Sequence, residues 1–301
     1  MEKAIIAEIK ENSLDDGPGI RTVLFFKGCP LSCVWCHNPE TKSARMELSF
    51  DAKECIGLKD CLRVCSEKAL DPNFSGFIHR DLCSLCFNCV NACANEAFSV
   101  VGKTITIDEI LEIICRYIPF YKTSGGGITL SGGEFTVYME FCGKLLKKVK
   151  DLGIHTLVET CGFFDIDNFE KFIIPNVDQI YFDIKIMDEV IHKKYCGRSN
   201  KQILDNFSKL YMKHLNGELQ VIPRVPLVPE ITATPNNLLA IANFFKANYV
   251  KQVSLLPYNP LWIEKADKIG KTANYNCKQW MTAEEIERYR SYFQDFEIVK
   301  V

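Results

Sequence analysis

Three cysteines near the N-terminus have the spacing of an iron–sulfur cluster site. Cys29, Cys33 and Cys36 form a C-x3-C-x2-C triplet directly after an apolar run at 22–26. Three thiolates leave one iron of a four-iron cubane without a protein ligand, and an open metal position is what substrate chemistry requires. A zinc ion held by the three thiolates and His37 is the alternative. The triplet therefore predicts a metal centre that takes part in a reaction.

A second group of seven cysteines lies between positions 55 and 93. The later run has the C-x2-C-x2-C-x3-C spacing of a bacterial ferredoxin half, and the earlier run has the same period with Leu58 in the second ligand position. In two-cluster ferredoxins the fourth cysteine of each run serves the other cluster. The spacing therefore predicts a complete ligand set of Cys65, Cys83, Cys86 and Cys89, and an incomplete set of Cys55, Cys61 and Cys93. A structural zinc module is the alternative.

The elements that must position the triplet follow a β/α pattern, in which apolar runs alternate with amphipathic stretches. Strands are expected at 22–26, 128–130, 155–159, 179–184, 219–225 and 252–256, with a further strand-like run at 5–9. Helices are expected at 138–151, 202–215 and 235–246, the last with Thr234 as N-cap and Pro235 at its first position. Six parallel strands predict an α/β fold, a partial (β/α)6 TIM-like barrel whose site lies at the C-terminal strand ends.

The domain organisation follows from the change in composition along the chain. Residues 50–100 are rich in cysteine and show little helical or strand period, so they are expected to fold around clusters as an inserted ferredoxin-like iron–sulfur module. Residues 1–49 and 101–301 are expected to form the barrel. The five remaining cysteines show no ligand spacing and are expected to be small buried apolar side chains: Cys115, Cys142, Cys161, Cys196 and Cys277.

Composition and charge limit the classes of partner. The chain has 301 residues, 47% of them hydrophobic and 25% charged, which is typical of a globular protein. Its 36 basic and 38 acidic residues give a formal charge of −2, so neither nucleic acid nor an anionic membrane is an expected partner. No apolar run approaches the ~20 residues of a membrane span, and the N-terminus lacks a signal core. Closely spaced cysteines then predict metal ligands in a reducing, cytoplasmic location.

The segments around the triplet resemble glycyl-radical-enzyme activating enzymes of the radical S-adenosylmethionine (SAM) superfamily, in the subgroup with a ferredoxin-like two-cluster insertion. The family pattern H-D-G-P-G-x-R appears as D-D-G-P-G-I-R from Asp15 to Arg21, and G-C-x3-C-x-[YW]-C-H-N-P follows it. The resemblance implies a 4Fe-4S cluster whose open iron binds SAM. One electron then cleaves SAM to a 5′-deoxyadenosyl radical, which removes hydrogen from a glycine of a partner enzyme. By the same resemblance, Asp16 and Arg21 help to receive the partner's glycine loop.

Further motifs of this family extend along the chain. They are S-G-G-G-I-T-L-S-G-G-E at 124–134, E-T at 159–160, D-I-K at 183–185, an arginine after the fifth strand, and L-L-P-Y-N at 255–259. Phe135 and Asn259 depart from the usual proline and histidine. Asp183 and Lys185 share one side of a strand. The resemblance implies that SAM is bound by Trp35, Cys36, His37, Gly132, Gly133, Glu134, Glu159, Thr160, Asp183, Ile184, Lys185, Arg224 and Asn259.

The expected function is therefore the activation of a glycyl radical enzyme, with electrons supplied by a flavodoxin or ferredoxin-type donor. One alternative is a radical SAM enzyme that acts directly on a small molecule, which the D-G-P-G-x-R segment argues against. Another is a non-catalytic iron–sulfur electron carrier, which leaves the open iron and the SAM motifs unexplained. The motifs are shared among activases of several glycyl radical enzymes, so they do not distinguish the partner.

Overall fold

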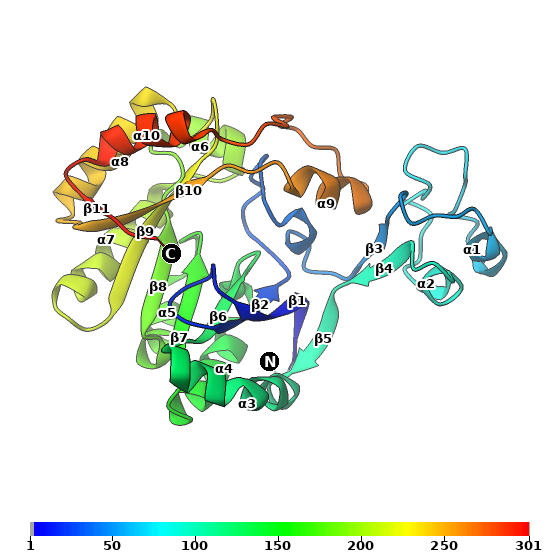
Figure 1. The fold of residues 1–301 in the computed structure, drawn as a ribbon, viewed down its shortest axis with the longest axis horizontal. Coiled ribbons are helices and arrows are strands. Elements are labelled where there is room, and N and C mark those ends of the chain that lie inside the picture. The colour runs from blue at the N-terminus through cyan, green and yellow to red at the C-terminus, as the bar shows by residue number, and fades with distance from the viewer. Residues whose placement is uncertain (1–2, 301) are drawn as a thin grey trace.

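A computed structural model describes residues 3–300, and its main body is a nine-stranded sheet (Figure 1). Six neighbouring strands run parallel. They are β2 Arg21–Phe26, β6 Gly127–Gly132, β7 His155–Thr160, β8 Gln179–Asp183, β9 Gln220–Leu227 and β10 Gln252–Pro257. All six strands expected from the sequence are confirmed, each within two residues of its observed ends.

Three further strands extend the sheet at its two edges: β1 Lys3–Ser13, β5 Lys103–Thr106 and β11 Glu297–Ile298. Strand β1 pairs antiparallel with β2 and with β5, and β11 pairs parallel with β10. The strand order therefore runs from β11 to β5 without closing. This open, curved sheet is the partial barrel that the β/α pattern predicts.

Most helices of the main body cover the outer face of the sheet (Figure 1). The helices of the main body are α3 Ile107–Ser124, α4 Met139–Asp151, α5 Ile166–Phe172, α6 Glu189–Cys196, α7 Lys201–Leu215, α8 Pro235–Ala247, α9 Trp262–Lys268 and α10 Ala283–Arg290. Of these, α9 lies between the sheet and the cysteine-rich segment. The three expected helices are confirmed as α4, α7 and α8, and Thr234 caps α8 by accepting from Asn237 N. Helix α3 is absent from the expectations, although its capping box of Thr106 and Glu109 is readable in the sequence. In the part of the chain that the structure describes, no helix is long and apolar enough to cross a membrane.

The two faces of the strands carry different chemistry. Outward side chains such as Phe182 join the main core, where its ring lies 5.3 Å from that of Phe207 on α7. Inside the barrel, a separate apolar floor is formed by Leu157, Tyr181, Ile222 and Val299. Two residues further along β7, β8 and β9, and so on the same side as the floor, lie Glu159, Asp183 and Arg224. The strand period thus places charged groups directly above an apolar floor.

The loop between β1 and β2 is held inside the barrel by Arg21. Its guanidinium is fully buried and donates through Nε to Thr129 Oγ1 (2.7 Å), through Nη1 to Pro18 O (3.0 Å) and through Nη2 to Ile128 O. The Thr129 hydroxyl donates to Asp16 O at 2.8 Å. The side chain of Arg21 has no exposed surface, and the expectation that it helps to receive the partner's loop stays a prediction. Arg21 supports the loop that carries Asp16.

Close contact between two backbones explains the S-G-G-G segment. A Cβ on Gly126 would lie 1.9 Å from Ile20 O, and a Cβ on Gly19 would lie 2.4 Å from Gly126 N. Ile20 N donates to Ser124 Oγ at 2.9 Å, and Gly127 N donates to Ile20 O at 3.2 Å. These glycines lie where β6 begins, so they pack against the β1–β2 loop at the end of the strand remote from Gly132.

The cysteine-rich segment forms a small unit of its own, at the right of Figure 1. It contains the short helices α1 Asp60–Val64 and α2 Asn88–Asn91 and is carried on an antiparallel ribbon of β3 Glu47–Phe50 and β4 Phe98–Val101. Its buried cluster is separate from that of the barrel and consists of Leu48, Cys61, Leu70, Ile78, Cys89 and Phe98. This core is small, because cysteines take up positions that apolar side chains would otherwise fill.

The backbone contact at Gly126 predicts a large loss of stability for Gly126→Ala. The added methyl meets the Ile20 carbonyl, which is backbone and cannot rotate away, so we expect a loss of about 3 kcal/mol relative to Gly125→Ala. Gly125 is the matched control, since its φ is +71° but a Cβ there meets nothing within 4 Å. The measurement is the urea midpoint at unchanged m-value. Equal midpoints for the two variants would contradict the argument.

Candidate functional site

A cavity of about 450 Å³ opens at the C-terminal ends of the barrel strands. Its wall includes most of the residues that the motifs predict: Asp16, Cys29, Cys33, Trp35, Cys36, His37, Gly132, Gly133, Glu159, Thr160, Asp183, Lys185, Arg224 and Asn259. The side chains of Glu134, Ile184 and Arg21 are not part of this wall. Residues spread over more than two hundred positions are thus brought to one space.

The triplet loop is fixed by backbone bonds to two neighbouring segments. Gly28 N donates to Thr41 O at 2.6 Å, and Cys29 N donates to Lys42 O at 3.1 Å. On the other side, Ser32 N donates to Cys196 O at 2.9 Å, at the end of α6. The loop that must hold the cluster is therefore held from both sides.

The three thiols of the triplet all belong to residues in the cavity wall. A cubane takes each thiolate at a different iron, so three thiolates leave one iron open. Burial raises the pKa of Cys36 to about 12, whereas a hydrogen bond from Cys196 lowers that of Cys33 to about 7 despite burial. Binding of a metal must therefore displace a proton from Cys36.

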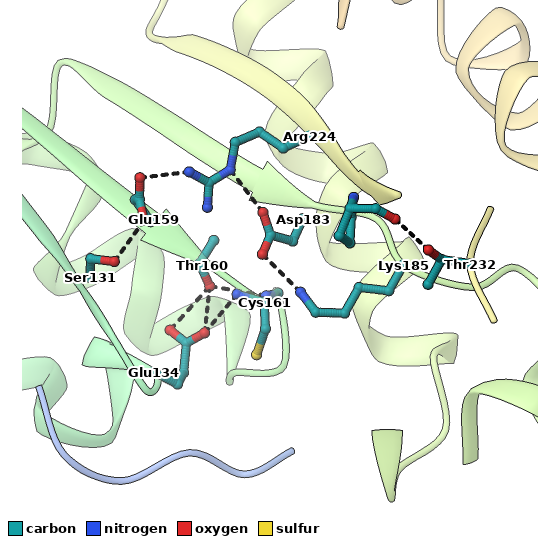
Figure 2. Close-up of polar contacts among 11 residues, drawn as sticks. Ser131, Glu134, Glu159, Thr160, Cys161, Asp183, Lys185, Arg224 and Thr232 are labelled. Atoms are coloured by element: carbon teal, nitrogen blue, oxygen red, sulfur yellow. Dashed lines mark hydrogen bonds and ion pairs between the residues drawn. The ribbon is translucent and has the colours of Figure 1, made fainter. Parts of the chain in front are cut away.

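Four charged side chains form a connected network above the apolar floor (Figure 2). Arg224 Nη1 lies 2.6 Å from Glu159 Oε1, and Arg224 Nε lies 2.8 Å from Asp183 Oδ1. Lys185 Nζ lies 2.8 Å from Asp183 Oδ2, and Ser131 Oγ donates to Glu159 Oε2 at 2.6 Å. The charges of the two cations and two anions sum to zero, and their close pairing offsets the free-energy cost of removing them from water.

The electrostatics of this network keep Asp183, Lys185 and Arg224 charged. Burial acts to raise the pKa of Asp183, but Arg224 and Lys185 outweigh it and hold that pKa below its usual value. Burial acts to lower the pKa values of Lys185 and Arg224, but the neighbouring carboxylates outweigh it and raise both. The cavity thus presents fixed positive and negative groups side by side. Such a surface suits a zwitterionic ligand.

The side chain of Glu134, which the resemblance implies is a SAM contact, lies outside the cavity wall. It is 1% exposed, and its carboxylate accepts from Thr160 Oγ1 at 3.0 Å and from Cys161 N at 2.8 Å, as Figure 2 shows. Burial raises its pKa, against the effect of these donors. The carboxylate therefore links the ends of β6 and β7 beneath the cavity. The side chain of Ile184, another expected SAM contact, is buried in the main core. Its N–H donates to Arg224 O at 2.9 Å and so connects the end of β8 to β9.

Two glycines in the cavity wall, Gly132 and Gly133, allow close contact between two backbone segments. A Cβ on Gly132 would lie 2.5 Å from Phe26 N, and a Cβ on Gly133 would lie 2.3 Å from Gly28 O. The missing side chains thus let β6 pack against the backbone that leads into the triplet. The same lack of side chains also lets a ligand approach this part of the cavity wall.

His37 contributes an unpartnered polar atom to the site. Among the described residues, nothing binds its buried Nε2. Burial chiefly, with Lys265 and Lys185 nearby, lowers its pKa to about 4, so the ring is neutral at pH 7. Its ring centroid lies 5.7 Å from that of Tyr258, next to Asn259. A free nitrogen in the cavity wall is consistent with a bound group that completes its hydrogen bonding.

Two further cysteines, Cys161 and Cys196, lie beside the triplet, and the cysteine spacing in the sequence did not identify them as part of the site. Cys161 lines the cavity, and a hydrogen bond to Cys29 together with burial raises its pKa. Cys196 is fully buried, and its hydrogen bond to Cys33 raises its pKa too. The position of Cys161 directly after a predicted strand was a usable signal for it, whereas nothing in the sequence pointed to Cys196.

The module groups its cysteines as the ferredoxin spacing predicts. One hollow is lined by Cys55, Leu58, Cys61 and Cys93, and another by Cys65, Cys83, Cys86 and Cys89. The two halves repeat each other, because Ala69 N donates to Cys65 Sγ and Ala97 N donates to Cys93 Sγ, both at 3.3 Å. Both sets are therefore assembled by residues from both runs.

Comparison with known proteins agrees with this architecture. The Radical SAM superfamily matches residues 79–242, and a 4Fe-4S single cluster domain matches residues 15–68. Among solved structures, a radical SAM methyltransferase from Sphaerobacter thermophilus superposes with a TM-score of 0.52 over 98% of this chain and 76% of that chain. At 11% identity this likeness concerns the fold alone. Fold and sequence thus define a radical SAM enzyme.

Full-length relatives narrow the family. The isethionate sulfite-lyase activating enzyme of Oleidesulfovibrio alaskensis is 38% identical over 89% of this chain and 88% of its own length. The 4-hydroxyphenylacetate decarboxylase activating enzyme of Clostridioides difficile is 34% identical over 97% of this chain and 94% of its own length. The trans-4-hydroxy-L-proline dehydratase activating enzyme of the same organism is 33% identical over 96% of each chain. The chain belongs to the glycyl-radical-enzyme activating enzymes, a family that uses SAM and an iron–sulfur cluster.

The charge network predicts that Arg224→Met makes the protein sensitive to acid. Without Arg224, two buried carboxylates lose a partner, so we expect a loss of about 3–5 kcal/mol at neutral pH. Ionised Asp183 contributes stability above its unfolded pKa, and this contribution is lost as the pH falls through its lower folded pKa. In the variant the folded pKa rises, and acid unfolding should begin at a higher pH.

Circular dichroism during an acid titration measures this shift. Arg116→Met is the control, since Arg116 is exposed on helix α3. The same acid midpoint in both variants would show that the network does not stabilise the fold.

Proposed function

We propose that this chain activates a glycyl radical enzyme by binding SAM in the cavity, next to a 4Fe-4S cluster on Cys29, Cys33 and Cys36. The observation that carries the proposal is that the three thiols and the charge network line one cavity, together with Asp16 of the β1–β2 loop. When bound, the reduced cluster and SAM supply a 5′-deoxyadenosyl radical that takes a hydrogen atom from a glycine of the partner.

The residues of this chain divide the work of holding SAM. Arg224 and Lys185 present donors to its carboxylate, and Glu159 and Asp183 present acceptors to its ammonium group. Gly132, Gly133 and Thr160 form the wall beside this end. Trp35, His37 and Asn259 lie on the wall near the triplet and suit the adenosyl part, where the free Nε2 of His37 gains a partner.

The partner class follows from the family, and the loop at the cavity fits it. Asp16 reaches the cavity on a loop that is anchored through Arg21 and Thr129, so an extended segment carrying glycine can meet it there. We propose two further clusters in the module, one on the complete set and one on the incomplete set. A flavodoxin or ferredoxin-type protein would reduce them in the cytoplasm, and they would relay the electrons to the cluster at the triplet.

Two other functions are weighed against this one. A radical SAM enzyme acting on a small molecule would need neither the loop at the cavity nor partner radical formation. An electron carrier would need no cavity beside the triplet. Relatives at 33–38% identity over most of the chain are all named as activating enzymes, which supports the first function.

The first test of the function is Cys33→Ala. Two thiolates cannot hold a cubane with one open iron, so anaerobically reconstituted, reduced protein should lose SAM cleavage to 5′-deoxyadenosine while the module keeps its iron. Cys115→Ala is the control and should cleave SAM as the parent does, because Cys115 is exposed on helix α3 and not buried as its lack of ligand spacing suggested. Full cleavage by the Cys33 variant would sink the assignment.

The second test concerns the incomplete set, in which Leu58 replaces a thiolate. An aliphatic side chain cannot ligate iron, and the nearby Asp60 is paired with Arg63 at 2.8 Å. We expect a labile cluster, with about eleven or twelve irons per chain for three clusters and about eight in Cys55→Ala. Leu58→Cys should make the cluster resistant to loss.

Iron analysis with Mössbauer spectroscopy measures both variants. About eight irons in the parent, unchanged in Cys55→Ala, would mean that this cluster does not form.

A further inference from the structure

The cysteine-rich module is joined to the barrel by a narrow stalk. Strand β3 enters the module, strand β4 leaves it, and the two form a separate two-stranded sheet (Figure 1). A two-stranded ribbon is only marginally stable by itself and twists readily. The orientation of the module therefore depends on contacts beyond the stalk.

The base of the stalk is fixed through Glu47. The fully buried Lys27 places Nζ 3.0 Å from Glu47 Oε2, and Lys271 places Nζ 3.0 Å from Glu47 Oε1. Gly102 follows β4 with a φ of +114°, and a Cβ there would lie 2.7 Å from Lys27 Cδ. These contacts hold the start of the stalk but not its far end.

Arg80 holds the module itself. Its Nη1 donates to Leu48 O at 2.7 Å, and its Nη2 donates to Lys268 O at 3.2 Å, at the C-terminal end of helix α9 where a cation is favoured. Gly270 makes room for it, since a Cβ there would lie 2.2 Å from Arg80 Nε. The carbonyl of Arg80 also accepts from Cys83 N at 3.3 Å. One residue thus connects the turn before a cysteine of the complete set to helix α9.

Helix α9 is connected in turn to the triplet loop. Lys265 Nζ lies 3.2 Å from Asn38 Oδ1 and 3.1 Å from Glu40 Oε1, just after Cys36. In Figure 1 this helix lies between the barrel and the module. The route from Cys83 to Cys36 therefore passes through Arg80, α9 and Lys265 by direct contacts.

Two ion pairs accompany Arg80 at this joint but are weaker restraints. Lys53 and Glu264 are 2.5 Å apart with side chains 72% and 62% exposed, so their pair contributes little. Lys268 Nζ lies 2.6 Å from Asp51 Oδ2 and is partly exposed. Arg80 is half-buried and spans two carbonyl acceptors, and bonds from a charged donor are the stronger ones.

We propose that Arg80 and helix α9 form a positioning bridge that holds the complete cysteine set at a fixed separation from the triplet, so that electrons pass between them. The inference rests on the proposed relay of electrons through the module. Arg80 is a positioning residue, because it acts through α9 and the turn before Cys83. Gly270 belongs to the bridge because any side chain there displaces the guanidinium.

The test uses the full chain with its clusters reconstituted. Arg80→Met keeps the apolar stem and removes both donations. Arg63→Met is the matched control, since Arg63 is an exposed arginine of the module that is paired with Asp60. Pulsed EPR measures the magnetic coupling between module and barrel clusters. SAM cleavage is driven either by flavodoxin or by dithionite, which reaches the barrel cluster without the module.

For Arg80→Met we expect a weakened coupling and a flavodoxin-driven rate lowered about tenfold, with the dithionite-driven rate unchanged. Arg63→Met should match the parent protein. Gly270→Ala should also weaken the coupling, although Arg80 is still present. This second variant distinguishes loss of the bridge from poor folding of the Arg80 variant. Unchanged coupling in both Arg80→Met and Gly270→Ala would overturn the bridge.

The relay is tested separately with Cys86→Ala, which removes a ligand of the complete set. Flavodoxin-driven cleavage that persists in this variant would refute the relay. The bridge would still be judged by the coupling in the Arg80 and Gly270 variants, because that coupling reports distance and orientation whatever route the electrons take.

Discussion

The placing of Arg224 between Glu159 and Asp183 is the interaction on which the mouth of the barrel depends. Removing four charges from water costs several kcal/mol for each ion unless they are paired closely. Here β7, β8 and β9 bring the pairs to 2.6–2.8 Å, and Lys185 and Ser131 satisfy the remaining carboxylate oxygens. The strand register must therefore hold for the charges to be tolerated. The same strongly polar array is one that a zwitterionic group can enter by exchanging partners.

Backbone packing without side chains determines where the loops around this array lie. At the start of β6, Gly126 admits the carbonyl of Ile20, and the β1–β2 loop is thereby seated inside the barrel. At the end of β6, Gly132 and Gly133 admit the backbone around Phe26 and Gly28, which leads directly into the cysteine triplet. Strand β6 thus fixes the position of the loop that carries Asp16 and of the loop that carries the cysteine triplet.

The module follows a different physical rule from the barrel. Its apolar core is small, and its two cysteine sets are each assembled from two distant stretches of chain. Metal bound by these sets, as proposed, would contribute to its folding free energy, because the ligand sets would hold the stretches together. Its link to the barrel relies on a few polar contacts, chiefly those of Arg80, so its orientation depends on single residues. The apolar core of the barrel, by contrast, spreads its stability over many side chains.

The sequence by itself determined the features whose information is local. Strand and helix periods located the six parallel strands and three of the helices. Cysteine spacing predicted both groupings of the module, because each ligand run is short and the ferredoxin order assigns the fourth cysteine of each run to the other set. Tertiary structure decided the features that depend on neighbours. Glu134 and Glu159 are both acids at strand ends, yet one turns into a buried bond with Thr160 while the other lines the cavity. Arg21 is buried because Thr129, Pro18 and Ile128 supply acceptors for its guanidinium. Cys196 reaches Cys33 only because α6 packs against the triplet loop. Such contacts join residues distant in the chain, and no spacing or period in the sequence encodes them.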